Sequence, residues 1–410
     1  MRISYLFALS LFIFLPTPCS AEDLLKLSRN QKLSLSEVVS QAVARNPKQQ
    51  LLKAGSAIVD ARNQQASGLL PSAPAVTLGH QNDVVGSNRN LYEWEVGLEL
   101  PIWMPGQRLA RESIALSAKN DLESSRNSLA LEIAGQVRDT LWSISMADGD
   151  IKLAESQYLT AQSLQNDVEK RWKAGELAKT DVMMAENITL GVKNTLIRVQ
   201  AELKHAEHRY WMLTGLKELP QTFEETLHTR EGIDDSHPWL IEANSKTEVA
   251  NGQRDLMRIE KRENPQVFIN ARRERGGFDT LYNDSVGVSV RVPLDAKTRS
   301  APMLAGAEMD VAQAMSEREQ RRLLLESSFH EAEHNLETIN AQITLVEQQY
   351  KLSQDGLQLA KKSFSLGESD LVSLLRSQSI AYEAERSLIN LHIQKQWNIA
   401  RYNQSIGVLP

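Results

Sequence analysis

The sequence matches itself without gaps when it is shifted by 192 residues, and this duplication constrains the fold more than any single motif. The matching pairs include Pro101 with Pro293, Tyr158 with Tyr350, Gly175-Glu176 with Gly367-Glu368, and Arg209-Tyr210 with Arg401-Tyr402. Agreement at one offset over so long a stretch predicts two copies of one structural unit. We expect the first unit at residues 22–215 and the second at 216–410.

The first 21 residues have the pattern of a secretory signal peptide. Arg2 precedes an apolar run that ends at Leu15, and we expect cleavage after Ala21. The run is too short to be a membrane-spanning helix. The only cysteine, Cys19, lies in this segment. Pro16-Thr17-Pro18 fits a lipidation signal poorly, and whether Cys19 is lipidated stays open.

Composition excludes several classes of function. The chain carries 46 Lys and Arg against 52 Asp and Glu, and this charge of −6 argues against nucleic acid as a partner. After residue 21 there is no apolar run of the length that a membrane-spanning helix needs. The sequence shows neither a glycine-rich phosphate loop nor a Ser/His/Asp arrangement. We therefore expect no enzyme activity and no cofactor.

Each unit predicts a first helix, a β-hairpin and a long helical hairpin. The expected first-unit elements are a helix at 35–66, capped by Ser34 or Ser36, a β-hairpin at about 73–101, and helices at 108–172 and 180–214. Those of the second unit are 238–262, about 266–293, 300–364 and 371–406. The fold class is mainly α with a small β part.

The strands alternate strictly between apolar and polar residues. In "LYEWEVGLEL" the apolar side chains of Tyr92 to Leu100 share one face, and Glu93, Glu95 and Glu99 share the other. One interpretation is a small soluble sheet on helices. The other is a set of membrane strands, because strands of about 9–11 residues span an outer membrane. In that case the glutamates face a pore.

Four amphipathic strands cannot close a barrel, and lipid does not tolerate open sheet edges. If the strands enter a membrane, several copies must therefore share them. Three copies supply about twelve strands, an even number within the range of known barrels.

The long helices carry a seven-residue repeat, with Ile343, Tyr350, Leu357 and Phe364 in one register. This pattern is typical of a coiled-coil seam. We expect hairpin tips at residues 146–150 and 338–342. Asp148, Asp150 and Asn340 are then candidates for a gate around a pore axis, and the Asp-Gly pattern fits an ordinary turn equally well.

Two further residue pairs mark boundaries. Gly175 and Gly367 are expected to permit a break within a long helix, or to be plain helix C-caps. Pro101 and Pro293 are expected where strands give way to helices at a membrane boundary.

The stretch "HEAEH" at residues 330–334 reads as the zinc-peptidase motif H-E-x-x-H. However, Leu325, Phe329, Ala332 and Leu336 form the apolar seam here, so His330 and His334 point to its flank. The duplicated position has no histidine. We interpret both histidines as solvated, with a transit metal contact or a zinc hydrolase using Glu331 as the alternatives.

The chain resembles the TolC-type outer-membrane efflux family. The motifs are "LSLSEVVSQAVARNP", "VGLELPI" and "VRVPL" before the long helices, and "RWKAGE" and "SFSLGES" at the predicted breaks. The resemblance implies a homotrimer with a shared 12-stranded barrel in the outer membrane and a helical barrel in the periplasm. It also implies a periplasmic adaptor (membrane fusion) protein and an inner-membrane RND-type pump as partners.

Within that family, the compact length is most similar to the outer-membrane subunits of cobalt–zinc–cadmium efflux systems. The resemblance thus implies a passive conduit, with heavy-metal cations as one cargo among metals, drugs and proteins. A periplasmic coiled-coil scaffold that never enters the membrane is the alternative from another class.

Overall fold

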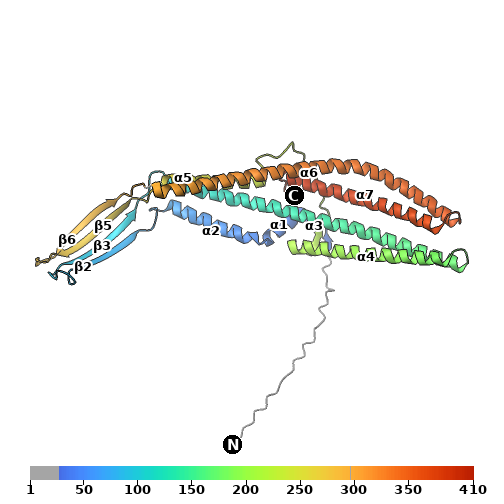
Figure 1. Cartoon of the computed structure of the whole chain (residues 1–410), viewed down its shortest axis with the longest axis horizontal. Coiled ribbons are helices and arrows are strands. Elements are labelled where there is room, and N and C mark those ends of the chain that lie inside the picture. Colours follow the sequence, from blue (N-terminus) through green and yellow to red (C-terminus); the bar gives the residue numbers. More distant parts are fainter. Residues whose placement is uncertain (1–26, 296) are drawn as a thin grey trace, which may run out of the picture.

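The computed structural model describes residues 27–295 and 297–410, so the expected signal peptide and Cys19 lie outside the described residues. The chain forms a long rod (Figure 1). A β-sheet occupies one end, and the turns of two helical hairpins occupy the other. The mainly helical fold class with a small sheet is confirmed.

The elements follow one another in the predicted order. The first unit contains α1 (Leu35–Arg45), α2 (Lys48–Ser67), β2 (Ala75–Asn82), β3 (Tyr92–Pro101), α3 (Gln107–Lys173) and α4 (Lys179–Thr214). The second contains α5 (Pro238–Ile259), β5 (Gln266–Arg275), β6 (Asn283–Arg291), α6 (Lys297–Ser365) and α7 (Leu371–Ser405). Two short strands, β1 (Ser28–Asn30) and β4 (Glu218–Pro220), pair in parallel near the middle of the rod.

The first predicted helix is two helices. Ser34 caps α1 through a capping box with Glu37, as expected for one of the two candidate serines. The break follows at Asn46, which is extended (φ −64°, ψ 132°) because the following Pro47 disfavours helical geometry in the residue before it.

The predicted hairpin tips at 146–150 and 338–342 are wrong, because α3 and α6 run through both stretches without interruption. Each helix is on the order of 100 Å long at 1.5 Å per residue. Gly149 has a packing role instead of a turn role. A Cβ there would lie 3.2 Å from Ile393 and 3.3 Å from Ile389, so the glycine lets α7 approach α3 closely. Tertiary packing thus overrides the local turn preference.

The four long strands form one antiparallel sheet in the order β2-β3-β5-β6. The central pair β3 and β5 joins the two units, with Val96 opposite Ala271. Strands β2 and β6 are the two edges, and each pairs with one strand only. Four strands thus leave two rows of backbone hydrogen-bonding groups unpaired.

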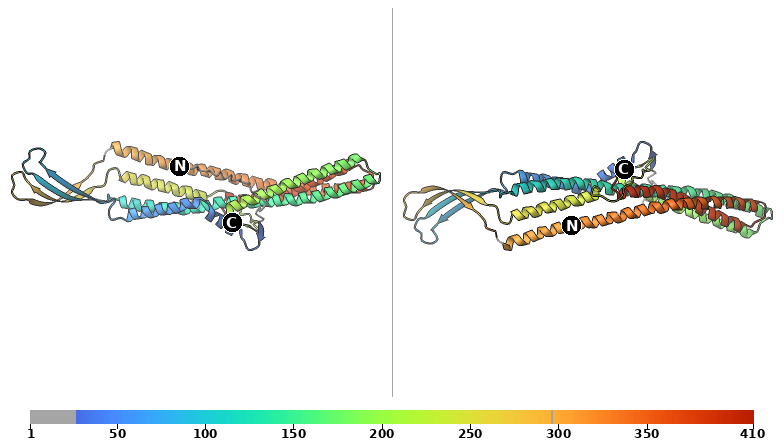
Figure 2. Two further views of the ribbon diagram at one scale, coloured as in Figure 1. Left: turned by 90° about the horizontal axis from the view of Figure 1, so that it is seen from below. Right: turned by 90° about the horizontal axis from the view of Figure 1, so that it is seen from above.

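The helices lie along the rod and pack in pairs, α3 on α4 and α6 on α7, with α5 against both α3 and α6 (Figure 2). The largest core joins α1, α3 and α4 around Val38, Ile133, Val137 and Tyr210. The predicted seam residues Leu325, Phe329, Ala332 and Leu336 are buried. In the described part of the chain, no helix has both the length and the apolar character needed to cross a membrane.

Candidate functional site

The sheet has one apolar face that no other described part of the chain covers. The exposed fractions of Leu78, Val286 and Val288 are 79%, 78% and 69%. The strand register places these residues together with Trp94, Val96, Leu98, Ile269 and Val290 on the same face. A contiguous apolar surface of this kind marks a site of interaction with a membrane or a protein.

The opposite face is polar and internally paired. Arg272 contacts Glu93 at 2.7 Å and Glu274 at 2.6 Å, and the amide of Asn270 donates a 2.7 Å hydrogen bond to Glu95. Glu99 shares this face with Glu93 and Glu95. The sheet therefore separates an apolar surface from a charged one over most of its length.

Gly175 and Gly367 end α3 and α6 in the left-handed region, with φ of +83° and +77°. In the first hairpin the N–H of Glu176 donates to the carbonyl of Arg171 at 2.9 Å, and Glu368 makes the same bond to Ser363 at 3.0 Å. This is the Schellman pattern, which favours glycine. The expected helix breaks are thus the two hairpin tips.

Asp370 is the N-cap of α7, the helix that follows the second tip. Its carboxylate accepts a 2.9 Å hydrogen bond from the backbone N–H of Ser373 and so caps α7. Hydrogen bonds from the Ser373 hydroxyl and N–H lower the pKa of Asp370. The carboxylate therefore stays ionised at neutral pH.

The two tips touch through Arg171 of α3 and Phe364 of α6. The Arg171 guanidinium donates a 3.1 Å hydrogen bond to the Phe364 carbonyl and lies 4.8 Å from the centre of its ring. Beneath this contact Val168, Ala185 and Leu371 share a small buried core with Phe364. One arginine and one apolar cluster therefore join the tips of the two hairpins.

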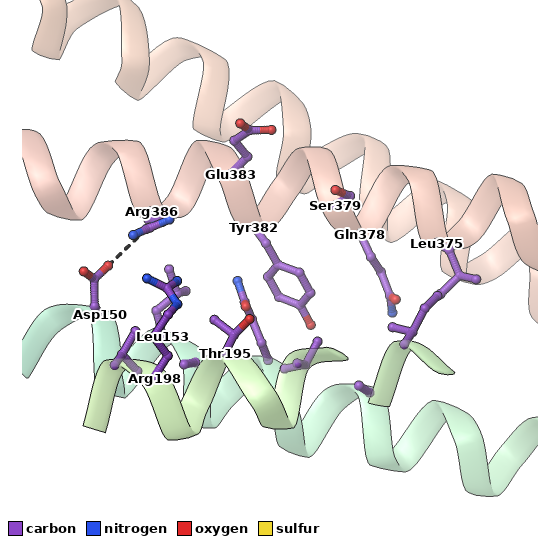
Figure 3. Close-up of a pocket in the computed structure, with 16 residues that line it drawn as sticks. Asp150, Leu153, Thr195, Arg198, Leu375, Gln378, Ser379, Tyr382, Glu383 and Arg386 are labelled. Carbon is purple, nitrogen blue, oxygen red and sulfur yellow. Dashed lines mark hydrogen bonds and ion pairs between the residues drawn. The ribbon is translucent and has the colours of Figure 1, made fainter. Parts of the chain in front are cut away.

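Farther from the tips, a cavity of about 430 Å³ separates α7 from α3 and α4 (Figure 3). Tyr382 and Gln378 enter it from α7, and Thr195 and Arg198 from α4. Burial raises the pKa of Tyr382. The two hairpins are thus loosely packed here, while Asp150 and Arg386 bridge them at 3.0 Å.

The gate candidates do not lie at a tip, because they belong to uninterrupted helices. Asp148 pairs with Arg29 at 2.8 Å, and Asp150 pairs with Arg386. Asn340 is exposed on α6. The structure therefore brings two of these residues to contacts between elements and leaves the third on the surface.

The histidines of "HEAEH" lie on the exposed flank of α6. The side chains of His330 and His334 are 75% and 80% exposed. Their nearest acidic neighbours are Glu333 at 3.7 Å and Glu337 at 3.9 Å, one turn along the same helix. Across the described ranges, no three His, Cys, Asp or Glu side chains converge in a way that would hold a metal ion.

The prolines lie at strand ends. Pro101 is the last residue of β3, and Pro293 follows β6 by two residues. Five residues separate Pro101 from the start of α3, and three separate Pro293 from that of α6.

Arg171 is the contact that sequence reasoning missed. The sequence predicts the hairpin tip at 146–150 and predicts Gly175 as a break within a long helix or a helix C-cap, so it predicts no contact between tips for Arg171. The C-cap alternative is the correct one. A glycine after some 65 helical residues and before a new N-cap is a hairpin signal. That signal locates the tip, although it does not say which neighbouring helix Arg171 reaches.

Residues 235–408 match the family model described as "Outer membrane efflux protein". A comparison with curated proteins finds no match. Among solved structures, the fold is similar to CusC, with a TM-score of 0.74 at 14% identity over 93% of each chain. It is also similar to the outer membrane protein VceC of Vibrio cholerae, with a TM-score of 0.72 at 16% identity over 91% of this chain and 96% of that one. It is also similar to the CmeC outer membrane channel of Campylobacter jejuni, with a TM-score of 0.71 at 14% identity over 95% of this chain and 90% of that one.

Proposed function

We propose that the chain belongs to the outer membrane efflux protein family, whose model matches residues 235–408, and that it is the outer-membrane channel subunit of a tripartite efflux system. In this role it is a passive conduit and catalyses no reaction. The observation that carries the proposal is the uncovered apolar face of a sheet whose two edge strands are unpaired.

Three copies complete that sheet in the outer membrane. Lipid offers no hydrogen bonds to the free edges of β2 and β6, so these edges must pair with each other between copies. Three chains of four strands make a closed set of twelve. The apolar face then meets lipid, and Glu93, Glu95 and Glu99 line the lumen.

The internal duplication suggests how strand β6 of one copy pairs with strand β2 of the next. Within one chain β3 pairs with β5, and β6 and β2 are their duplicated counterparts. Val96 of β3 corresponds to Val288 of β6, since the two are 192 residues apart. Leu78, which pairs with Val96, therefore corresponds to Ile269, which pairs with Val288. Val290 of one copy then faces Leu78 of the next.

The helical hairpins extend from the sheet into the periplasm, where six of them surround a tube. Each tip is a tight glycine turn, and Arg171 and a small apolar core join the two tips of a chain. Separation of the hairpins would open the tube, a two-state change among packed helices. We propose that a periplasmic adaptor drives this change and that an inner-membrane pump of the RND type supplies the energy.

We propose heavy-metal cations as the cargo. The lumenal glutamates suit cations, since a ring of carboxylates concentrates positive ions. Deletion of the gene should raise sensitivity to cobalt, zinc or cadmium. Unchanged metal tolerance together with raised drug sensitivity would overturn the cargo and leave the channel standing.

The channel itself is tested by membrane fractionation and a gel of unboiled against boiled samples. A trimer-sized band in the outer-membrane fraction that collapses on boiling is the expected result. A periplasmic monomer or dimer would favour the coiled-coil scaffold instead.

A further inference from the structure

The apolar face of the sheet ends, at the loops farthest from the helices, in a cluster of aromatic rings and arginines. It consists of His80, Tyr92, Trp94, Arg273, Arg275 and Tyr282, and we call it the outer cluster. The rings of His80 and Trp94 stack at 4.0 Å between centroids, and Trp94 is 55% exposed. Aromatic side chains at the end of an apolar strand face are typical of a membrane–water boundary.

Within the described residues, Arg275 forms no ion pair with a carboxylate. Its guanidinium lies 5.0 Å from the centre of the Tyr92 ring and 5.1 Å from that of the Tyr282 ring. Its Nε atom is buried and has no hydrogen-bond partner in the described parts of the chain. Cation–π contacts of this kind use the faces of the rings and leave the N–H donors of the guanidinium able to bind an acceptor.

Arg273 lies two residues earlier on the same face. It is 5.0 Å from the centre of the Tyr282 ring and 3.6 Å from Asp284. The side chains of Arg273 and Asp284 are 61% and 71% exposed, so this ion pair is weak and can be exchanged.

Arg272, between them in sequence, shows the contrast. It lies on the opposite face, where Glu93 and Glu274 neutralise it at 2.7 Å and 2.6 Å. Arg272 is thus neutralised by two carboxylates, whereas Arg275 on the apolar face forms no ion pair within the described part of the chain and Arg273 forms only an exposed one. That difference calls for an anion next to the apolar surface.

We propose that Arg273 and Arg275 bind the phosphate groups of a phosphorylated lipid in the outer leaflet. Guanidinium groups bind phosphate oxygens through paired N–H donors. The exposed side chains of Leu78, Val286 and Val288 lie below on the same face and would contact the acyl chains. A free anion has no use for this apolar surface, whereas a lipid uses both parts. The inference rests on the proposed function, since it needs the sheet to lie in a bilayer.

The test uses the full-length mature protein in phosphatidylcholine nanodiscs that contain bisphosphorylated lipid A or its dephosphorylated form. Native mass spectrometry counts the lipid A molecules retained per trimer. The R273Q/R275Q variant should retain at least fivefold less of the phosphorylated form, and R275K should fall between it and the wild type. The matched control is R291Q, because Arg291 is an exposed arginine on the charged face at the other end of the sheet.

The outcomes separate this inference from the proposed function. A wild-type protein that fails to insert into nanodiscs overturns the membrane channel itself. Normal insertion with equal retention of phosphorylated and dephosphorylated lipid A overturns the phosphate site only, as does equal loss in R273Q/R275Q and R291Q. If inorganic phosphate displaces all retained lipid A at millimolar concentration, the site is one for free phosphate, and the commitment to a lipid is wrong.

Discussion

Replacement of Arg138 by Met should loosen the middle of the rod more than any change at an exposed ion pair. Arg138 lies on α3, and its side chain is only 2% exposed. Its guanidinium donates two hydrogen bonds to Glu225, at 2.7 Å and 2.6 Å, and others to Gln404 at 2.5 Å and the Val408 carbonyl at 3.0 Å. One side chain therefore joins α3, the C-terminal end of α7 and the segment between β4 and α5 (residues 221–237), which we call the connector.

The size of the effect follows from what the change leaves behind. The Glu225 side chain is only 11% exposed and would keep one 3.2 Å hydrogen bond, from Asn403. Removing one partner of a buried ion pair costs about 3–5 kcal/mol, because the remaining charge is neither solvated nor paired. The double variant R138M/E225Q removes that charge and should regain at least half of the loss.

The assay is thermal unfolding in detergent, followed by tryptophan fluorescence. Trp142 lies one turn from Arg138 and packs edge-on against Phe223 of the connector at 4.7 Å, so it reports on this junction. R401M is the control, because Arg401 and Asp139 pair at 3.5 Å with both side chains 53% exposed, a pair worth at most about 1 kcal/mol. An R138M protein that melts like R401M, or a double variant less stable than R138M, would refute this reasoning.

Three further predictions address the joint between copies, the tips and pH. The double variant L78C/V290C should form cross-links between subunits with a short bismaleimide, whereas T77C/V290C, on opposite faces, should not; the reverse pattern would refute the proposed register. R171A removes a hydrogen bond and a cation–π contact between the tips, worth roughly 1–2 kcal/mol together. Because this weakens the closed state, uptake of large antibiotics by cells should rise roughly tenfold. Unchanged uptake would contradict a role of Arg171 in holding the tips together. Burial lowers the pKa of His237, which is 1% exposed, to about 4. Since the folded state favours neutral His237, its full contribution to the free energy of unfolding should be present above about pH 6.5, and about 3 kcal/mol of it should be lost as the pH falls towards 4. H237Q should flatten this part of the curve of stability against pH. An equally steep curve for H237Q would contradict the role of His237.

Local patterns predicted most of the elements correctly. Strict alternation located β3 and β6, and the seven-residue repeat located the buried side of α6, including Phe329 and Leu336. These patterns survive because burial on one face must follow the period of the backbone, 2 in a strand and 3.6 in a helix. Gly175 and Gly367 could be identified as breaks or helix C-caps, because a C-cap depends on the conformation at one position.

The predicted tips failed because Asp148-Gly149-Asp150 carries two kinds of information that look alike in a sequence. A glycine between aspartates suits a turn, yet here it makes room for Ile389 and Ile393 of α7. The duplication hides a similar ambiguity. Arg138 and His330 are equivalent positions, but the first is buried under the connector and the second is exposed.

The sequence by itself determined the duplication, which appears when the sequence is compared with itself. It also determined the β-hairpins and the division of the sheet into an apolar and a charged face, because these depend on residues close together in the chain. Only the tertiary structure decided the contacts between hairpins, such as Arg171 with Phe364, and the contacts of Arg275 with the rings of Tyr92 and Tyr282. These contacts join residues about 190 positions apart or on different strands. Their geometry depends on how whole elements pack, which no local period encodes.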